Sequence, residues 1–182
     1  MDSGFTDFDV TLRDGRAVHI RAMRPTDVAE LVQAFSRMSE DARYMRFMRF
    51  VREPNLTRVR DAIAGFPEAG IGIVATVPAA DGIDIVGSAS YFVGNDRITC
   101  EFAIYVASEF GGVGLARTLL TALIGAAKAR GIKEMDGFVL ATNQPMLRLA
   151  RRLGFAIAPD PEDRTVCICR LRLADFRPEL PK

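Results

Sequence analysis

The chain has few of the residues that build metal sites or disulfide frameworks. Its 182 residues include one histidine, no tryptophan and three cysteines, Cys100, Cys167 and Cys169, with no C-x-x-C pair among them. Zinc sites need cysteine and histidine at short spacings, so we expect no metal site. An odd number of cysteines without a disulfide pattern is typical of reduced thiols in a cytoplasmic protein.

The chain also lacks an excess of one charge and any long apolar run. Its net charge is +1, so no basic surface field favours nucleic acid. No apolar stretch is long enough to cross a bilayer, and the acidic N-terminus is unlike a signal peptide. We therefore expect a cytoplasmic protein that binds neither nucleic acid nor membrane. The length suits one domain, which we place at residues 1–174, followed by a loose C-terminal tail at 175–182.

The most informative stretch runs from Thr99 to Leu120. Residues 100–107 form an apolar run that predicts a strand buried on both faces. Gly111, Gly112 and Gly114 follow in a turn, and apolar residues then recur at helical spacing. The pattern predicts a strand, a glycine-rich turn and a helix, in that order.

This turn predicts an anion site. N–H groups in the first turn of a helix have no internal partner, and the helix dipole adds positive charge there. The glycines would let a phosphate approach the backbone, and Arg117 would add a cation. The alternative is that a tight connection between strand and helix needs glycine only for its backbone dihedral angles. A P-loop is excluded because the Gly-Lys-Ser/Thr sequence is absent, and a dinucleotide fingerprint fails at Arg117, where it needs glycine.

The rest of the chain alternates short strand and helix patterns. Expected strands span 10–13, 17–23, 71–77, 83–93, 135–141, 155–158 and 165–173, and expected helices span 28–35, 42–50, 56–66 and 144–153. Tight turns join several successive strands, which favours antiparallel pairing. The predicted class is α/β (α+β), a mixed, mostly antiparallel central sheet flanked by helices. Thr26 and Asn143 are expected to cap helices, and His19 to be a half-exposed strand residue.

Four arginines recur at i+3 spacing in and after the expected helix 42–50. They are Arg43, Arg46, Arg49 and Arg52. The simpler interpretation is the solvated face of an amphipathic helix. The functional alternative is a lip that recognises an acidic partner or the phosphates of a cofactor.

Two motifs resemble those of the GNAT superfamily of N-acyltransferases. Gly114-Leu115-Ala116 is similar to the end of its pyrophosphate motif, Gln/Arg-x-x-Gly-x-Gly/Ala, although Gly111 replaces the first side chain. Asn143, followed by Leu153-Gly154-Phe155, resembles its Asn…Leu-Gly-Phe segment, and the order of elements from 10 to 173 also matches. The resemblance implies a single GNAT-like domain with acetyl-CoA as co-substrate and no metal.

The resemblance also implies where acetyl-CoA binds. The expected contacts are Ile104, Tyr105, Val106, Gly111, Gly112, Val113, Gly114, Leu115, Ala116, Arg117 and Asn143. In GNAT folds the strand ending near Val106 splays from the strand at 135–141, and the thioester lies in the gap. A backbone N–H near Val106 would then hold the oxyanion. Asn143 would contact the pantetheine arm or a bound water, a role compatible with capping.

Glu101 is the candidate general base. An alkylamine has a pKa near ~10.4 and must lose a proton before it attacks a thioester. An acid within an apolar strand is costly unless used or paired, and desolvation would raise its pKa. The alternative is a glutamate paired to an arginine; the resemblance implies the catalytic role. Ala150 stands where many GNAT enzymes have a tyrosine acid, which leaves Tyr105 and Ser108 as weaker substitutes.

Longer segments resemble the bacterial protein lysine acetyltransferases called Pat. These segments are 20–48, 100–106, 139–155 and 160–166. The resemblance implies acetyl transfer to a protein lysine, with an acyl-CoA synthetase as candidate partner. Two alternatives stay open: a small-molecule amine N-acetyltransferase on the same fold, and a non-catalytic acyl-CoA-binding regulatory module. The sequence does not indicate the oligomeric state, the acyl-chain preference or an effector.

Overall fold

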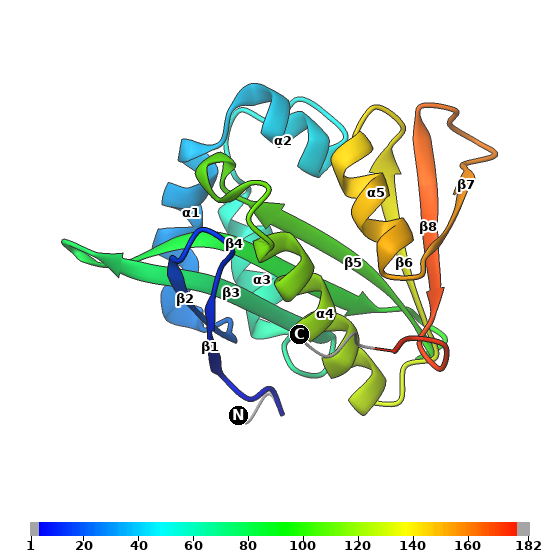
Figure 1. Ribbon diagram of the computed structural model, residues 1–182, viewed down its shortest axis with the longest axis horizontal. Coiled ribbons are helices and arrows are strands. Elements are labelled where there is room, and N and C mark those ends of the chain that lie inside the picture. The colour runs from blue at the N-terminus through cyan, green and yellow to red at the C-terminus, as the bar shows by residue number, and fades with distance from the viewer. Residues whose placement is uncertain (1–3, 178–182) are drawn as a thin grey trace.

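One continuous sheet runs through the computed structural model, which describes residues 4–177 (Figure 1). Its eight strands lie in the order β1-β2-β3-β4-β5-β6-β8-β7. They span Phe8–Thr11 (β1), Ala17–Ala22 (β2), Gly70–Ala79 (β3), Gly82–Val93 (β4), Thr99–Val106 (β5), Glu134–Leu140 (β6), Ala156–Pro159 (β7) and Val166–Arg172 (β8). Only β5 and β6 pair in parallel; every other neighbouring pair is antiparallel. The predicted mixed, mostly antiparallel sheet flanked by helices is confirmed.

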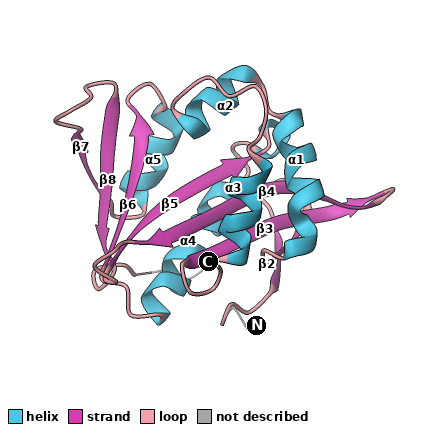
Figure 2. Cartoon of the chain, turned by 180° about the vertical axis from the view of Figure 1, so that it is seen from behind, coloured by secondary structure: helices cyan, strands magenta, loops and turns pink. Residues whose placement is uncertain are grey.

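Helices cover both faces of this sheet. They span Val28–Arg37 (α1), Glu40–Phe47 (α2), Leu56–Ala64 (α3), Leu115–Ala129 (α4) and Gln144–Arg152 (α5). The apolar stripe of α4, including Leu119 and Leu123, is fully buried in the main core. On the opposite face, Ala34 of α1 packs on Val74 and Ile85. Opposite views show α4 in front of the sheet in Figure 1, and α1 and α3 in front of it in Figure 2.

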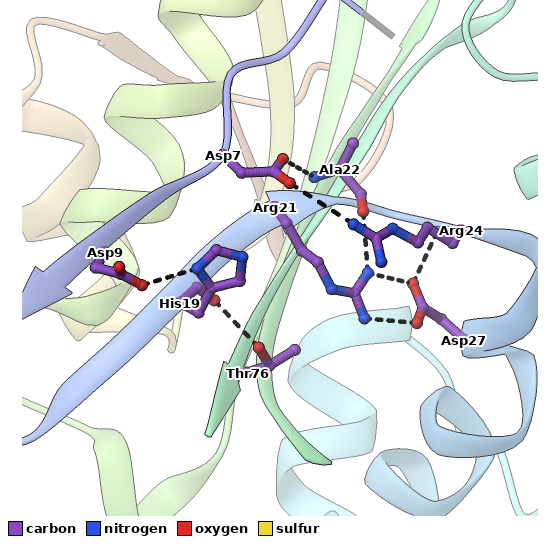
Figure 3. Close-up of polar contacts among 8 residues, drawn as sticks. All are labelled: Asp7, Asp9, His19, Arg21, Ala22, Arg24, Asp27 and Thr76. Atoms are coloured by element: carbon purple, nitrogen blue, oxygen red, sulfur yellow. Dashed lines mark hydrogen bonds and ion pairs between the residues drawn. The ribbon is translucent and has the colours of Figure 1, made fainter. Parts of the chain in front are cut away.

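A buried ion pair fastens β2 to the start of α1 (Figure 3). Arg21 is 6% exposed and Asp27 is 4% exposed. Arg21 donates two hydrogen bonds to the carboxylate, at 2.8 and 2.7 Å, and Asp27 also accepts the N–H of Arg24 at 2.7 Å. The expected cap, Thr26, instead lies inside a short 3-10 turn, Pro25–Asp27, so that prediction is wrong. Nearby, His19 is half-exposed, as predicted, and contacts Asp9 on the surface.

Helix α2 ends earlier than its sequence pattern predicts. The Ser39 hydroxyl caps it by accepting the Ala42 N–H at 3.1 Å. Met48 then adopts a left-handed conformation with φ 53°, which terminates the helix. The expected helix 42–50 is therefore too long at its C-terminal end. As a result, Arg49 and Arg52 lie beyond the helix rather than on one face of it.

The described part of the expected C-terminal tail is packed. Phe176 is 6% exposed and joins the main core. The Lys128 ammonium donates to the Phe176 carbonyl at 3.3 Å. At Phe176 the tail is therefore packed rather than loose. Its last residues, 178–182, lie outside the described part of the chain, and the domain boundary at 174 stays a prediction.

Gly137 of β6 leaves room for the ring of Phe102. A Cβ at position 137 would collide with that ring, which packs edge-on against Phe155 with centroids 5.4 Å apart. Gly137→Ala should therefore lower the free energy of unfolding by about 1–3 kcal/mol, the usual cost of overpacking, measured by urea denaturation. Gly125→Ala is the matched control. It has open space within α4 and should stabilise by roughly 0.5–1 kcal/mol; equal effects would contradict the packing argument.

Candidate active site

Strands β5 and β6 separate soon after they pair. Their parallel ladder extends only from Thr99↔Glu134 to Glu101↔Asp136. Past Glu101, β5 continues to pair with β4 as far as Val106, and β6 pairs with β8 as far as Leu140. Figure 1 shows the two strands diverging toward α2 and α5. The predicted splay is confirmed, and it leaves one edge of β5 without a neighbouring strand.

Backbone groups of β5 point into this opening. Near the start of β5, the Ile98 carbonyl accepts N–H groups from the start of β6, whereas the Ala107 N–H donates toward β4. Directions alternate along a strand. The even-numbered residues between them, Phe102, Ile104 and Val106, therefore direct their N–H and C=O groups toward the gap. The Val106 N–H lies where an oxyanion donor is expected from the sequence.

An open cleft of about 470 Å³ lies at this gap. Its walls come from β5, the glycine-rich turn, α5 and α2. The predicted contacts that line it are Ile104, Tyr105, Val106, Gly111, Gly112, Gly114, Ala116, Arg117 and Asn143, together with Glu101. Leu115 is fully buried and Val113 packs against the core, so these two predicted contacts can offer only backbone atoms. The cleft thus unites residues separated by more than 40 positions.

The glycine-rich turn presents free N–H groups at the start of α4. Gly112 has φ 75° and Gly114 has φ 100°, values that other residues rarely adopt. Within residues 4–177, no N–H of residues 112–116 finds an acceptor. The dihedral-angle interpretation of the glycines is confirmed, and the anion site stays a prediction. Their dihedral angles need glycine, and the same backbone forms a cradle suited to an anion at a helix N-terminus.

Cations surround this cradle. Arg117 and Arg152 line the cleft, as does Arg13 from the β1–β2 hairpin. The Arg13 N–H donates to the Val113 carbonyl at 3.2 Å, which fixes the hairpin against the turn. Sequence reasoning missed Arg13 and Arg152. Arg13 lies about a hundred positions from the turn, and no local spacing signals that contact.

Glu101 lies in the cleft but is not buried. It is solvent-exposed, so the prediction of a strand buried on both faces is wrong; the splay opens the space beside it. Partial desolvation and the charge of Asp136 raise the pKa of Glu101, while Arg46 of α2 lowers it. No ion pair joins Glu101 to a cation within the described residues. A carboxylate with a raised pKa, held at the mouth of the gap, can accept a proton.

A family model for the GNAT acetyltransferase domain matches residues 17–156. The chain belongs to this family. A Pseudomonas aeruginosa protein named as an acetyltransferase is 31% identical over 163 residues, which cover 90% of this chain and 88% of its own. A second protein of that organism, an L-methionine sulfoximine/L-methionine sulfone acetyltransferase, is 39% identical over 80 residues, 41% of this chain and 46% of its own. The prediction of an acetyltransferase is confirmed.

Solved structures share the whole fold. The GNAT domain of Pat from S. lividans superimposes with a TM-score of 0.82 at 22% identity, covering 91% of this chain and 96% of that domain. An acetyltransferase from Salmonella typhimurium, described with its cofactor acetyl-CoA, gives a TM-score of 0.70 at 21% identity. The match covers 88% of this chain and 96% of the Salmonella chain. These similarities confirm the single GNAT fold.

Two GNAT positions of the α5 region have clear structural roles here. The Asn143 side chain accepts the Met146 N–H at 3.3 Å, so its predicted capping role is confirmed; its contact with pantetheine stays a prediction. Ala150 is fully buried and offers no acid. Of the weaker substitutes, Tyr105 and Ser108 both line the cleft. Burial raises the pKa of Tyr105, which keeps its proton in place.

No candidate metal cluster of three histidine, cysteine, aspartate or glutamate residues occurs between residues 4 and 177. In the same part of the chain, no helix has the length and apolar character needed to cross a bilayer.

Asp136→Asn should move the acidic limb of the pH–rate profile of acetyl transfer to lower pH. Asp136 raises the pKa of Glu101, so removing its charge lets Glu101 ionise, and act as a base, in more acidic solution. The measurement is kcat/KM for the acceptor against pH. Glu134→Gln is the control, because Glu134 also contacts Arg170 but does not shift Glu101. An unmoved limb in Asp136→Asn would argue against Glu101 as the titrating group.

Proposed function

We propose that this protein transfers the acetyl group of acetyl-CoA to a lysine ε-amine of a protein, with an acyl-CoA synthetase as candidate target in the cytoplasm. The observation that carries the proposal is the placement of Glu101. Its carboxylate stands where β5 leaves β6, on the same cleft as the anion cradle at residues 112–116. A proton acceptor and a phosphate cradle on one cleft suit an enzyme that joins an amine to an acyl-CoA.

The cleft offers partners for the pyrophosphate and the pantetheine arm of acetyl-CoA. The free N–H groups of residues 112–116, with Arg13 and Arg152 nearby, fit the pyrophosphate. The free edge of β5 offers N–H and C=O groups to the amides of the pantetheine arm, as one strand pairs with another. Asn143 lies on the facing wall. The Salmonella structure described with acetyl-CoA supports this donor.

The residues of the cleft then divide the chemistry. Glu101 takes the proton of the acceptor ammonium, so that the free amine attacks the thioester carbonyl directly. The Val106 N–H donates to the oxyanion that forms. The amine nitrogen forms the new C–N bond as the C–S bond breaks, the thiolate leaves, and the second proton on the nitrogen passes to water. Tyr105 is placed to supply a proton to that sulfur, directly or through water.

The surface beside the cleft supports a protein acceptor. Tyr44, Met48 and Phe50 are 36%, 37% and 83% exposed, and Tyr44 packs on Phe50 with ring centroids 5.0 Å apart. Exposed aromatic and methionine side chains are enriched where proteins meet. The overall similarity to the GNAT domain of Pat points the same way. A small-molecule amine is the second candidate, favoured by the local similarity to the methionine sulfoximine acetyltransferase.

The first test is acetyl transfer from acetyl-CoA to an acyl-CoA synthetase of the same organism, followed by intact-mass spectrometry. We expect a mass increase of one acetyl group, on one lysine, and none with Glu101→Gln. Acetylation of small amines but not of the synthetase would replace the first candidate by the second. Binding of acetyl-CoA with no transfer to any amine would favour a non-catalytic regulatory module.

A further inference from the structure

Arg46 is a cation that lines the cleft. It lies on α2, is half-buried, and lines the cleft together with Glu101. Its guanidinium lies over the ring of Phe47, 5.0 Å from the centroid. It makes no hydrogen bond or ion pair with any residue between 4 and 177. Arg43, one turn earlier, differs: it donates to the Ser36 and Arg52 carbonyls, each at 3.2 Å, although its Nε–H is buried without a partner.

The surroundings of Arg46 remove part of the water from its charge. Burial lowers the pKa of Arg46, although an arginine stays charged at neutral pH. A partly desolvated charge is unfavourable unless an opposite charge and hydrogen bonds compensate for the lost water. Glu101 attracts Arg46, but no guanidinium nitrogen lies within 4.0 Å of a Glu101 carboxylate oxygen. The guanidinium therefore has donors available for an anion that enters the cleft.

The cleft wall holds one negative and one positive side chain, which suits an acceptor with both an ammonium group and an anionic group. Glu101 is the negative side chain and attracts the ammonium group. Asp136, its neighbour on β6, is occupied by Arg170 at 2.8 Å. Arg46 lies across from Glu101 on a different element, and Tyr105 also lines this wall. A group that bridges Glu101 and Arg46 would have an amine at one end and an anion at the other.

We propose that Arg46 binds a carboxylate of the acceptor, close to the amine that is acetylated. The proposal rests on the proposed function, for which the carboxylate is an acidic side chain beside the target lysine. Guanidinium and carboxylate groups match in shape and can form two parallel hydrogen bonds. A free amino acid would present the same chemistry through its own carboxylate. Because Arg46 lines the cleft together with Glu101, it is a determinant of acceptor choice.

Two matched pairs of acceptors test this proposal. The first pair is a lysine peptide with glutamate next to the lysine and the same peptide with glutamine there. The second is an L-amino acid and its carboxamide. For the wild-type protein we expect a preference of roughly 10- to 100-fold for the carboxylate member, mostly in KM, which is the scale of a charge-assisted hydrogen bond.

Variants of Arg46 separate recognition from structure. Arg46→Gln should abolish the preference, and Arg46→Lys should retain part of it. Removing Arg46 also raises the pKa of Glu101, but that change slows both members of a pair equally, so the ratio isolates recognition. Arg49→Gln is the matched control, since Arg49 is exposed and does not line the cleft. It should keep the full preference.

Each outcome is decisive. Equal rates for the two members of every pair in the wild type, or an unchanged ratio in Arg46→Gln, would overturn the role of Arg46. Preference for the amino acid with no peptide acetylated would support Arg46 and overturn the lysine acceptor. Acetylation of both peptides at equal rates would support the lysine acceptor and overturn the role of Arg46. No acetylation of any of the four acceptors would overturn both proposals.

Discussion

Glu101→Gln should lower kcat/KM for acetyl transfer by about 10²- to 10⁴-fold, the usual contribution of a positioned general base. Glutamine keeps the size of the side chain but cannot take the proton of an ammonium acceptor. The raised pKa of Glu101 brings the carboxyl closer to the working pH, so the lost group is a stronger base than a free glutamate. The measurement is steady-state kinetics, with acetyl-CoA affinity followed by calorimetry.

Binding of acetyl-CoA should be unchanged in Glu101→Gln. The cradle at residues 112–116 and the free edge of β5 do not include the Glu101 side chain. Glu68→Gln is the control, because Glu68 is exposed in a loop outside the cleft. It should leave both kinetics and affinity as they are. A Glu101→Gln protein that transfers acetyl groups at the wild-type rate would exclude Glu101 as the base.

Local patterns were sufficient for much of this fold. Periodicity of apolar residues located the long helix after the glycine-rich turn, and the cap at Asn143 followed from residue type alone. The turn at Gly112 and Gly114 was also visible, because left-handed dihedral angles select glycine. These features depend on neighbours in sequence, which a single chain displays directly.

Features that depend on distant contacts were less visible. Glu101 is exposed because β5 and β6 diverge, and a buried strand and a strand beside a cleft share one apolar composition. Arg13 reaches the cradle only through packing of the hairpin on the turn. Phe176 is in the core although its flanking residues are polar. The end of α2 at Met48 had no glycine or proline to signal it.

The second large effect concerns the buried ion pair between Arg21 of β2 and Asp27 at the start of α1. Asp27→Asn should lower the free energy of unfolding by about 3–5 kcal/mol, because it leaves the Arg21 charge buried without a counter-charge. Both partners are less than a tenth exposed, at 6% and 4%. The measurement is urea denaturation at neutral pH. Asp9→Asn, which loses an exposed contact to His19, should cost no more than about 1 kcal/mol.

The double variant Arg21→Met/Asp27→Asn distinguishes a buried-charge penalty from general damage. It removes the charge that Asp27→Asn leaves unpaired, and the asparagine oxygen can still accept the Arg24 N–H. We therefore expect it to be more stable than Asp27→Asn alone, as when a buried pair is replaced on both sides. A double variant no more stable than Asp27→Asn would mean that side-chain shape, rather than charge, determines the stability at the Arg21–Asp27 pair.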